Sequence, residues 1–391
     1  MKKTLLAAAL IAGFAGVAKA ETSVILYGIV DTGVAYEQVK ARDSVTGEKL
    51  KATRTGLKDG GLSGNRWGLK GSEDLGDGLR ANFRLESGFN LSNGHQAQDG
   101  RLFGRWATVG VSGDSWGSLD FGRQDNVASR FFVDAYGTGK WDTGAVRAFG
   151  GGVDGLRLDN AVVYATPSFE GFQAAVGYTF KHDGTQDWKL KGEKDQNSTG
   201  WTAGLRYANG PIEVAGTYDN IRLGSAGRTA IIDSNTGAVI GHTPYTQFKR
   251  ASSYTVSGAY DFEVVKLSLA FGQSFDGYYF LTSDYDLTSS GYKKKYDVNS
   301  YAVSLSAPVG NGTLAGTYNL AQPRKLAKTD LYVDANGNAI KSKKQHSFGL
   351  SYDYPLSKRT TVYAIGGYTK HVNFSDNGKR TVAGVGVRHA F

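Results

Sequence analysis

The sequence predicts an all-β protein, a transmembrane antiparallel β-barrel of about 16 strands. Segments of about ten residues alternate apolar and polar side chains; in 301–306, Tyr301, Val303 and Leu305 share one face, as in a strand with one apolar side. The breaks between segments are alternately short and long, which is typical of strands that run up and down across a membrane. No run of eighteen apolar residues follows residue 20, so no transmembrane helix is expected.

Residues 1–20 have the features of a cleaved signal peptide. Lys2 and Lys3 form a positive start, an apolar stretch follows over 4–17, and Ala18 and Ala20 form a small-residue cleavage site. The chain has no cysteine, so an exported domain would have no disulfide support. A closed barrel satisfies its backbone groups without one. We therefore predict a single outer-membrane domain over 21–391.

The first strands follow in order along the chain. The alternation predicts strands over 23–36, 66–75, 79–86 and 105–111, and a long polar connection over 37–63. Short turns are predicted near 74–78, 113–117, 167–171, 209–211, 261–263, 308–312 and 355–358. Long connections are predicted near 125–155, 181–199, 222–250, 276–298, 321–344 and 371–380. We expect the short turns on the periplasmic side and the long loops outside, around a water-filled lumen.

Several basic side chains have the parity of the lumen. In the strands over 66–75 and 79–86, Lys70, Arg80 and Arg84 face inward. Inward charges are common in any water-filled barrel, because they remain hydrated. Without the three lysines of residues 1–20, the net charge falls from +9 to 42 − 36 = +6, and no basic helix or RNA-binding motif accompanies it. We therefore expect no nucleic acid partner.

Signatures of chemical catalysis are weak. Gly150, Gly152 and Gly155 have the spacing of a dinucleotide loop, but no strand precedes them directly and no helical period follows. The six histidines are scattered, and no Gly-x-Ser-x-Gly elbow is found. The sequence predicts no enzyme, no cofactor and no metal site.

A family resemblance covers almost the whole chain after residue 20. The segments SVILYGIVD, RWGLKGSEDLGDGL, GRLFGRWATVG, GSLDFGRQ, DNAVVYATPSFEGF and GVGVRHAF resemble the general porins of Gram-negative outer membranes, particularly the betaproteobacterial porins of the Bordetella and Neisseria type. The resemblance implies a 16-stranded barrel, a homotrimer and a third loop folded into the pore. It also implies that Phe391 is a signal for the barrel-assembly machinery.

The resemblance also implies a pore constriction. Arg66, Arg105 and Arg157 occupy positions of basic residues that line the constriction in anion-preferring relatives. The candidate opposing acids on the third loop are Asp134, Asp142 and Asp154.

The implied function is passive diffusion of small hydrophilic solutes and ions, with a preference for anions, in a barrel surrounded by outer-membrane lipids and lipopolysaccharide. Two alternatives remain open. One is a channel specific for one solute, and the other is a barrel whose loops act as an adhesin or surface antigen.

Overall fold

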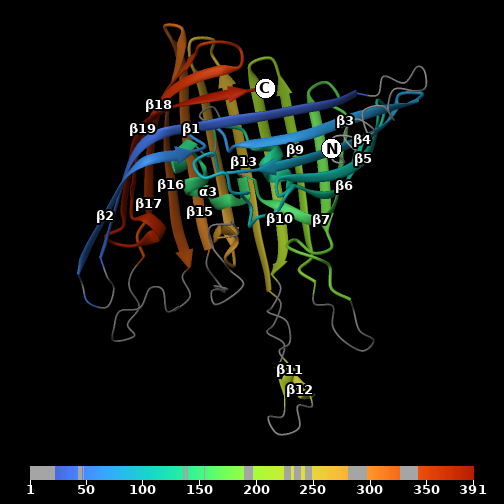
Figure 1. Ribbon diagram of the computed structural model, residues 1–391, viewed down its shortest axis with the longest axis horizontal. Helices are drawn as coiled ribbons and strands as arrows, with labels where there is room; N and C mark the ends of the chain where they lie inside the picture. Colours follow the sequence, from blue (N-terminus) through green and yellow to red (C-terminus); the bar gives the residue numbers. More distant parts are fainter. Residues whose placement is uncertain are drawn as a thin grey trace, which may run out of the picture.

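The chain folds into one closed antiparallel barrel. The computed structural model describes residues 23–42, 46, 48–134, 137, 140–153, 155–188, 197–223, 230–232, 239–242, 249–280, 297–325 and 342–391. The first strand pairs with the last, so the sheet closes on itself (Figure 1). The predicted signal peptide, residues 1–20, lies outside the described residues and stays a prediction.

The strands that form the barrel sheet are β1 (Ser23–Arg42), β2 (Lys49–Asp59), β3 (Arg66–Gly76), β4 (Leu79–Gly88), β5 (Trp106–Gly113), β6 (Gly117–Asp125), β7 (Arg157–Ala165), β8 (Phe172–Thr179), β9 (Gly200–Asn209), β10 (Ile212–Leu223), β13 (Lys249–Asp261), β14 (Lys266–Phe275), β15 (Asp297–Val309), β16 (Gly312–Lys325), β17 (Gln345–Pro355), β18 (Thr360–Lys370) and β19 (Lys379–Ala390). A separate hairpin consists of β11 (Ala230–Ile232) and β12 (Val239–His242). The short helices are α2 (Val127–Phe131), η1 (Lys140–Asp142), α3 (Val146–Phe149), η2 (Gly150–Val153), η3 (Tyr278–Phe280) and η5 (Val372–Phe374). None of the helices in the described ranges is both long and apolar enough to cross a membrane.

The barrel has 16 strand positions although its sheet contains 17 strands. β1 pairs with β3 through residues 23–29 and with β2 through residues 32–42. β2 and β3 therefore share one edge of β1 and fill one position, and 17 − 1 = 16. This confirms the predicted fold class and strand number.

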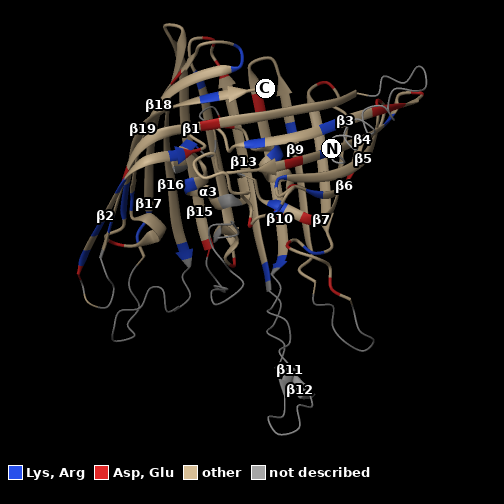
Figure 2. Cartoon of the chain, in the orientation of Figure 1, with Lys and Arg blue, Asp and Glu red and all other residues tan. Residues whose placement is uncertain are grey.

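One predicted connection is wrong. Residues 37–63, expected to be a long polar stretch, instead extend β1 to Arg42 and form β2 (Figure 2 marks several basic residues along β2). Residues 49–59 are rich in Lys, Arg and Thr and do not alternate apolar and polar side chains. Glu37 on β1 faces Lys58 on β2, with Oε1 and Nζ 2.9 Å apart. Ion pairs between neighbouring strands neutralise these charged side chains. A prediction from hydrophobicity alone assigns such a polar segment to a loop.

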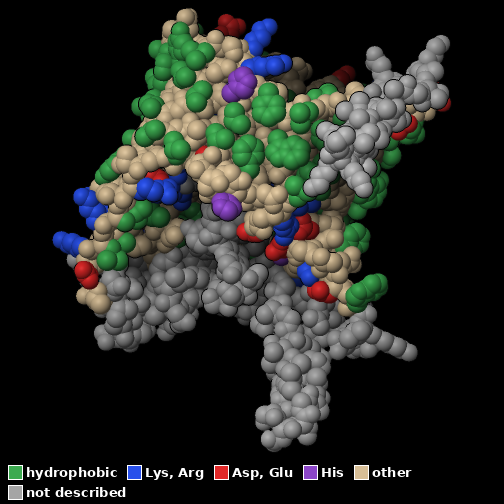
Figure 3. Space-filling view, in the orientation of Figure 1, with side chains coloured by type: hydrophobic (Ala, Val, Ile, Leu, Met, Phe, Trp, Pro, Cys, Tyr) green, Lys and Arg blue, Asp and Glu red, His purple; other side chains and the backbone are tan. Residues whose placement is uncertain are grey.

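The outer surface of the barrel is apolar. Outward positions hold exposed Leu, Val and aromatic side chains, such as Val109, Leu205 and Val385. Figure 3 shows hydrophobic side chains, in green, spread over the visible face of the barrel. Aromatic rings pair near the strand ends; the centroids of Tyr260 and Phe262 lie 4.4 Å apart. Such a surface matches a membrane-spanning barrel with interfacial aromatic residues.

The C-terminal residue completes the closing seam. The backbone of Phe391 exchanges two hydrogen bonds with Gly28 on β1, each 3.1 Å long. Its ring lies directly over Gly28, where a Cβ atom would be only 2.3 Å from Cζ of Phe391. Glycine is therefore required at this point of the seam if the ring is to keep its place.

The described residues of the third long loop, which connects β6 to β7, lie inside the barrel. The amide of Val127 donates to Thr202 Oγ1 at 2.8 Å, and the amide of Val133 donates to Ser257 Oγ at 3.0 Å. Asn319 Nδ2 donates to the carbonyl of Gly144 at 3.1 Å. These contacts reach from β9 to β16, so the predicted folding of this loop into the lumen is confirmed (α3 lies within the barrel in Figure 1).

Candidate functional site

The polar cavity of interest lies between the third loop and the ends of β6 and β7, from which the loop departs. Its volume is about 280 Å³. It is lined by Arg105, Asp125, Ser129, Phe132, Asp134, Gly137, Val153, Gly155 and Arg157. Two of the three arginines that the resemblance implied are therefore in one cavity with an acid of the third loop.

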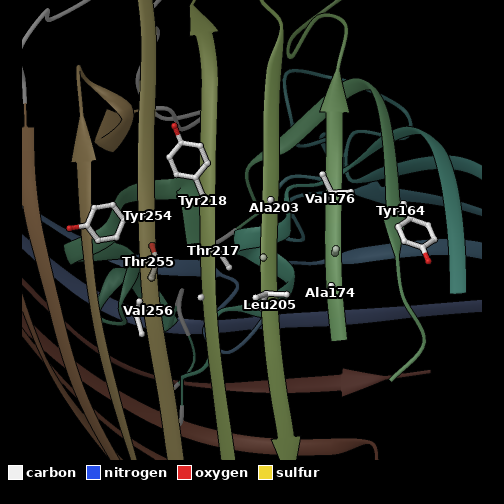
Figure 4. A pocket seen from close by; sticks show the side chains of 13 residues that line it. Tyr164, Ala174, Val176, Ala203, Leu205, Thr217, Tyr218, Tyr254, Thr255 and Val256 are labelled. Carbon is white, nitrogen blue, oxygen red and sulfur yellow. The ribbon is translucent and has the colours of Figure 1, made fainter. Parts of the chain in front are cut away.

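A larger cavity, of about 570 Å³, has a different character. It is an apolar groove across β8, β9, β10 and β13, lined by outward side chains such as Val176, Leu205 and Val256 (Figure 4). These side chains are exposed on the outside of the barrel. The groove faces the membrane and is not a site for a hydrophilic solute.

The three predicted arginines influence one another electrostatically, because the charges of Arg105 and Arg157 both repel that of Arg66. Arg105 and Arg157 line the polar cavity, and Arg66 does not. Arg105 Nε lies 2.6 Å from Glu86 Oε1, and Arg157 Nε lies 3.3 Å from Asp125 Oδ1. Each of these two arginines is thus held against the barrel wall by a carboxylate.

Arg66 is held differently. Its Nε donates to the carbonyl of Gly64 at 2.9 Å, and within the described part of the chain no carboxylate lies within ion-pair distance of it. The turn before it is fixed by the buried carboxylate of Asp31. Oδ2 of Asp31 accepts from the amides of Leu62 and Ser63, both at 2.8 Å. A fixed turn places the guanidinium of Arg66 in the lumen.

Arg84 belongs to the same wall. It donates to Glu86 Oε2 at 2.6 Å, and its Cζ lies 4.2 Å from the centroid of the Trp106 ring. Lys70 is directly opposite Arg84 in register, with Nζ 5.4 Å from the Tyr27 ring. Cation–π contacts of this kind stabilise like charges that would otherwise repel.

Arg80, the third inward basic residue predicted from parity, lies elsewhere. Its Nη1 is 2.7 Å from Oδ1 of Asp114, in the short turn between β5 and β6. It is at the short-turn end of the barrel and does not line the polar cavity.

Sequence reasoning missed Arg130 on α2. Its Cζ lies 4.9 Å from the Trp106 ring, and its Nη2 donates to Gln124 Oε1 at 2.6 Å. Burial lowers the pKa of Arg130, although guanidinium keeps its charge at neutral pH. A local signal existed, because Asn126 caps α2 by accepting from the amide of Ser129, and Asn is a preferred residue at the start of a helix.

Of the three candidate acids of the third loop, the structure places only Asp134 in the cavity. Asp134 lines the polar cavity, and its Oδ1 accepts from Ser304 Oγ at 2.9 Å. Asp142 ends η1, but its side chain lies outside the described residues, as does the whole of Asp154. The carboxylates nearest the arginines are Glu86 and Asp125, which the sequence did not single out as site residues.

The surroundings of the cavity carry excess positive charge. Its own lining is balanced, with Arg105 and Arg157 against Asp125 and Asp134. The adjoining charged groups are the cations Arg66, Lys70, Arg84 and Arg130 and the carboxylates Glu86 and Asp120, so the formal balance of lining and adjoining groups is 6 − 4 = +2. A fixed positive charge in a narrow aqueous passage concentrates anions. The described residues contain no cluster of His, Cys, Asp and Glu able to hold a metal.

Comparison with known proteins agrees with this architecture. A family model described as Gram-negative porin matches residues 7–373. The chain is 42% identical to an outer membrane porin protein of Bordetella pertussis over the full length of both chains, and 32% identical to outer membrane porin protein 32 of Delftia acidovorans, also over both full lengths.

Solved structures give the same picture. An anion-selective porin from Comamonas acidovorans superposes with a TM-score of 0.65 at 27% identity, covering 95% of this chain and 100% of that one. OmpT of Vibrio cholerae, at 16% identity and a TM-score of 0.61 for a loop-deletion variant, covers 95% of this chain and 99% of that one, and shares the fold. The chain therefore belongs to the Gram-negative porin family and is an outer-membrane porin.

Proposed function

We propose that this porin is a passive diffusion channel for small hydrophilic solutes and ions, with a preference for anions. The observation that carries the proposal is the excess of arginine over carboxylate around the polar cavity. The similar Comamonas acidovorans porin, which is anion-selective, supports the same direction. Passive diffusion requires no cofactor and no chemical step.

We propose further that the functional unit is a homotrimer. Small outward residues on the early strands, Ala81 and Ala107, would let neighbouring barrels approach closely, and the family resemblance implies trimers. Migration of the unheated, folded protein as a monomer in a mild-detergent gel would contradict this.

The selectivity proposal is tested by replacing Arg66, Arg105 and Arg157 together with Gln. Each change removes one permanent charge and keeps a polar side chain. An ion that passes each arginine at intermediate dielectric should feel on the order of 1 kcal/mol. Three arginines should then shift the anion-to-cation permeability ratio by about tenfold or more. The measurement is the zero-current potential of the reconstituted channel in a potassium chloride gradient.

Arg80→Gln is the matched control. It also removes one inward arginine, but this arginine pairs with Asp114 away from the polar cavity, so the potential should stay close to the parent's. The parent's preference should also hold between mildly acidic and mildly basic pH, because guanidinium does not titrate there. A potential carried by histidine would fade above about pH 6.5. If the triple variant keeps the parent's potential, the arginines do not set the selectivity.

A further inference from the structure

The wall of the barrel is interrupted between β2 and β3. β2 ends at Asp59, opposite Thr32 of β1, and β3 begins at Arg66, opposite Ile29 of β1. The connection has six residues, 60–65, where β1 has only two between the same pairs. Because six residues cannot pair with two, the surplus backbone must leave the sheet. We call residues 60–65 the inner turn.

The inner turn leaves the sheet on the side of the lumen. Leu62 packs against a cluster of inward side chains that includes Tyr363 of β18 and Trp141 of the third loop. The rings of Trp141 and Tyr363 meet edge to face, with their centroids 5.7 Å apart. The inner turn and η1 of the third loop therefore rest on the same inward surface of the barrel.

A buried carboxylate fixes the inner turn in this position. Asp31 is fully buried, and its Oδ1 accepts from the amide of Gly61 at 3.0 Å and from the hydroxyl of Tyr363 at 2.6 Å. Its Oδ2 accepts from the next two amides of the turn. The amide of Asp31 in turn donates to Asn65 Oδ1 at 2.5 Å. Four donors on one buried carboxylate hold the segment against the wall.

The free side of the inner turn faces the charged part of the lumen. Gly64 is exposed, whereas Gly61 and Asn65 are buried. A Cβ atom at Gly64 would lie 3.6 Å from Nη1 of Arg105, which lines the polar cavity. The carbonyl of Gly64 accepts from Nε of Arg66. The exposed edge of the turn therefore lies beside two of the arginines to which we assign selectivity.

We propose that the inner turn is a second constriction element, which narrows the pore together with the third loop. Its exposed edge is glycine backbone, so it occupies part of the passage and still leaves room for the guanidinium groups beside it. The narrowing itself does not depend on the charge preference of the pore. A second part of the inference, that the turn holds Arg66 at the narrow point, rests on the proposed anion preference.

The test of the narrowing uses a single cysteine, because the chain has none of its own. Gly64→Cys and the control Gly56→Cys are made in the full-length protein and reconstituted in planar bilayers. A Cβ atom at Gly56, on β2, has no other atom within 4 Å, so a side chain there has space around it. Each thiol is then labelled with a methanethiosulfonate reagent that carries a sulfonate group, and labelling is verified by mass spectrometry.

Single-channel conductance is the readout. Labelling at Gly64 should lower the conductance by about half or more, whereas labelling at Gly56 should change it by about a tenth or less, because a bulky charged group obstructs only a narrow passage. If Gly64→Cys fails to fold, Ser63→Cys on the same turn should give the same loss on labelling.

The second arm tests the hold on Arg66. Tyr363→Phe removes one of the four donors to Asp31 and keeps the ring that packs against Trp141. We expect the anion-to-cation permeability ratio, measured from the zero-current potential, to fall by about twofold to fivefold, up to the contribution of one arginine. Tyr352→Phe is the matched control, because its hydroxyl donates to the carbonyl of Val309, away from the inner turn. Its potential should equal the parent's.

Each arm has an outcome that overturns its part of the proposal. Complete labelling of Gly64→Cys with no greater loss of conductance than at Gly56 would show that the inner turn does not narrow the pore. A lower unfolding midpoint of Tyr363→Phe with the parent's potential would show that Asp31 and Tyr363 only stabilise the barrel. If the parent itself has no anion preference, the proposed selectivity fails, and the conductance arm still decides the narrowing.

Discussion

The two walls of the pore are built in different ways. The wall of β3, β4 and β5 holds charged side chains in ion pairs, with Glu86 between Arg84 and Arg105. The wall from β9 to β18 is covered by the third loop, which is attached mainly by neutral hydrogen bonds from side chains such as Thr202 and Asn319. The first wall supplies charge to the solute path, and the second supplies the surface that narrows it.

The difference follows from what each wall must hold. A backbone segment brings its own amides and carbonyls, which need partners when they are buried. Small inward residues let that backbone come close: a Cβ atom on Gly349 or Gly367 would lie within 3.0 Å of Thr143 on the loop. Guanidinium groups instead need carboxylates, ring faces and access to water. One barrel therefore combines a polar neutral wall with a positive one.

The largest expected effect comes from a substitution that impairs assembly of the whole barrel, and therefore affects both walls. Phe391→Ala takes the ring from the seam between β19 and β1, where it covers Gly28. We expect a several-fold lower yield of folded protein in the outer membrane, with near-normal conductance for the channels that do form, because the ring lies outside the lumen. Val385→Ala is the control, an outward truncation on the same strand, opposite Val34 of β1, that leaves the C-terminal ring over Gly28 in place. Equal membrane yield of the Phe391 variant and the parent would contradict the assignment of this residue to assembly.

A smaller effect is expected when one carboxylate is neutralised on either wall, and the loss of stability should differ between the two walls. Glu86 is fully buried and pairs with two arginines, so Glu86→Gln leaves both without their counter-ion. Breaking a buried ion pair from one side costs about 3 kcal/mol or more. Asp353→Asn is the comparison on the other wall. It removes one mostly buried pair with Lys140, whose ammonium group also donates to Ser351 Oγ at 3.2 Å, and a smaller loss of about 1–3 kcal/mol is expected. Urea unfolding in detergent measures both, and equal losses would mean that the two walls do not differ in this way.

The smallest effect should be confined to the loop. Asn319 donates to two loop carbonyls, those of Thr143 and Gly144, at 3.2 and 3.1 Å. Asn319→Ala removes both bonds, about 1–3 kcal/mol of local stability, and amides in residues 140–149 should exchange hydrogen roughly tenfold faster.

Asn82→Ala, which removes a bond from Asn82 to Ser112 on a barrel strand, should leave that exchange unchanged. The anion-to-cation selectivity of both variants should equal that of the parent. Unchanged exchange over 140–149 in the Asn319 variant would show that the loop is held by other contacts.

Local alternation determined much of this protein. Successive residues of a strand point to opposite faces, so the period alone predicts that Lys70 and Arg84 face the lumen and that Val385 faces outward. It also predicts the number of strands. The alternation of short and long connections further predicts that the turns lie at one end of the barrel and the long loops at the other. These properties depend on neighbours in the chain, which is why sequence patterns identified them.

Only the tertiary structure decided the rest. The alternation could not show that residues 49–59 would form β2, because charged side chains there are paired across strands. Nor could it place Arg130 beside Trp106, or bring Lys40 and Lys379 from opposite ends of the chain directly opposite each other in the sheet. Register between distant strands and the path of a long loop depend on closure of the whole barrel, and no local pattern contains that information.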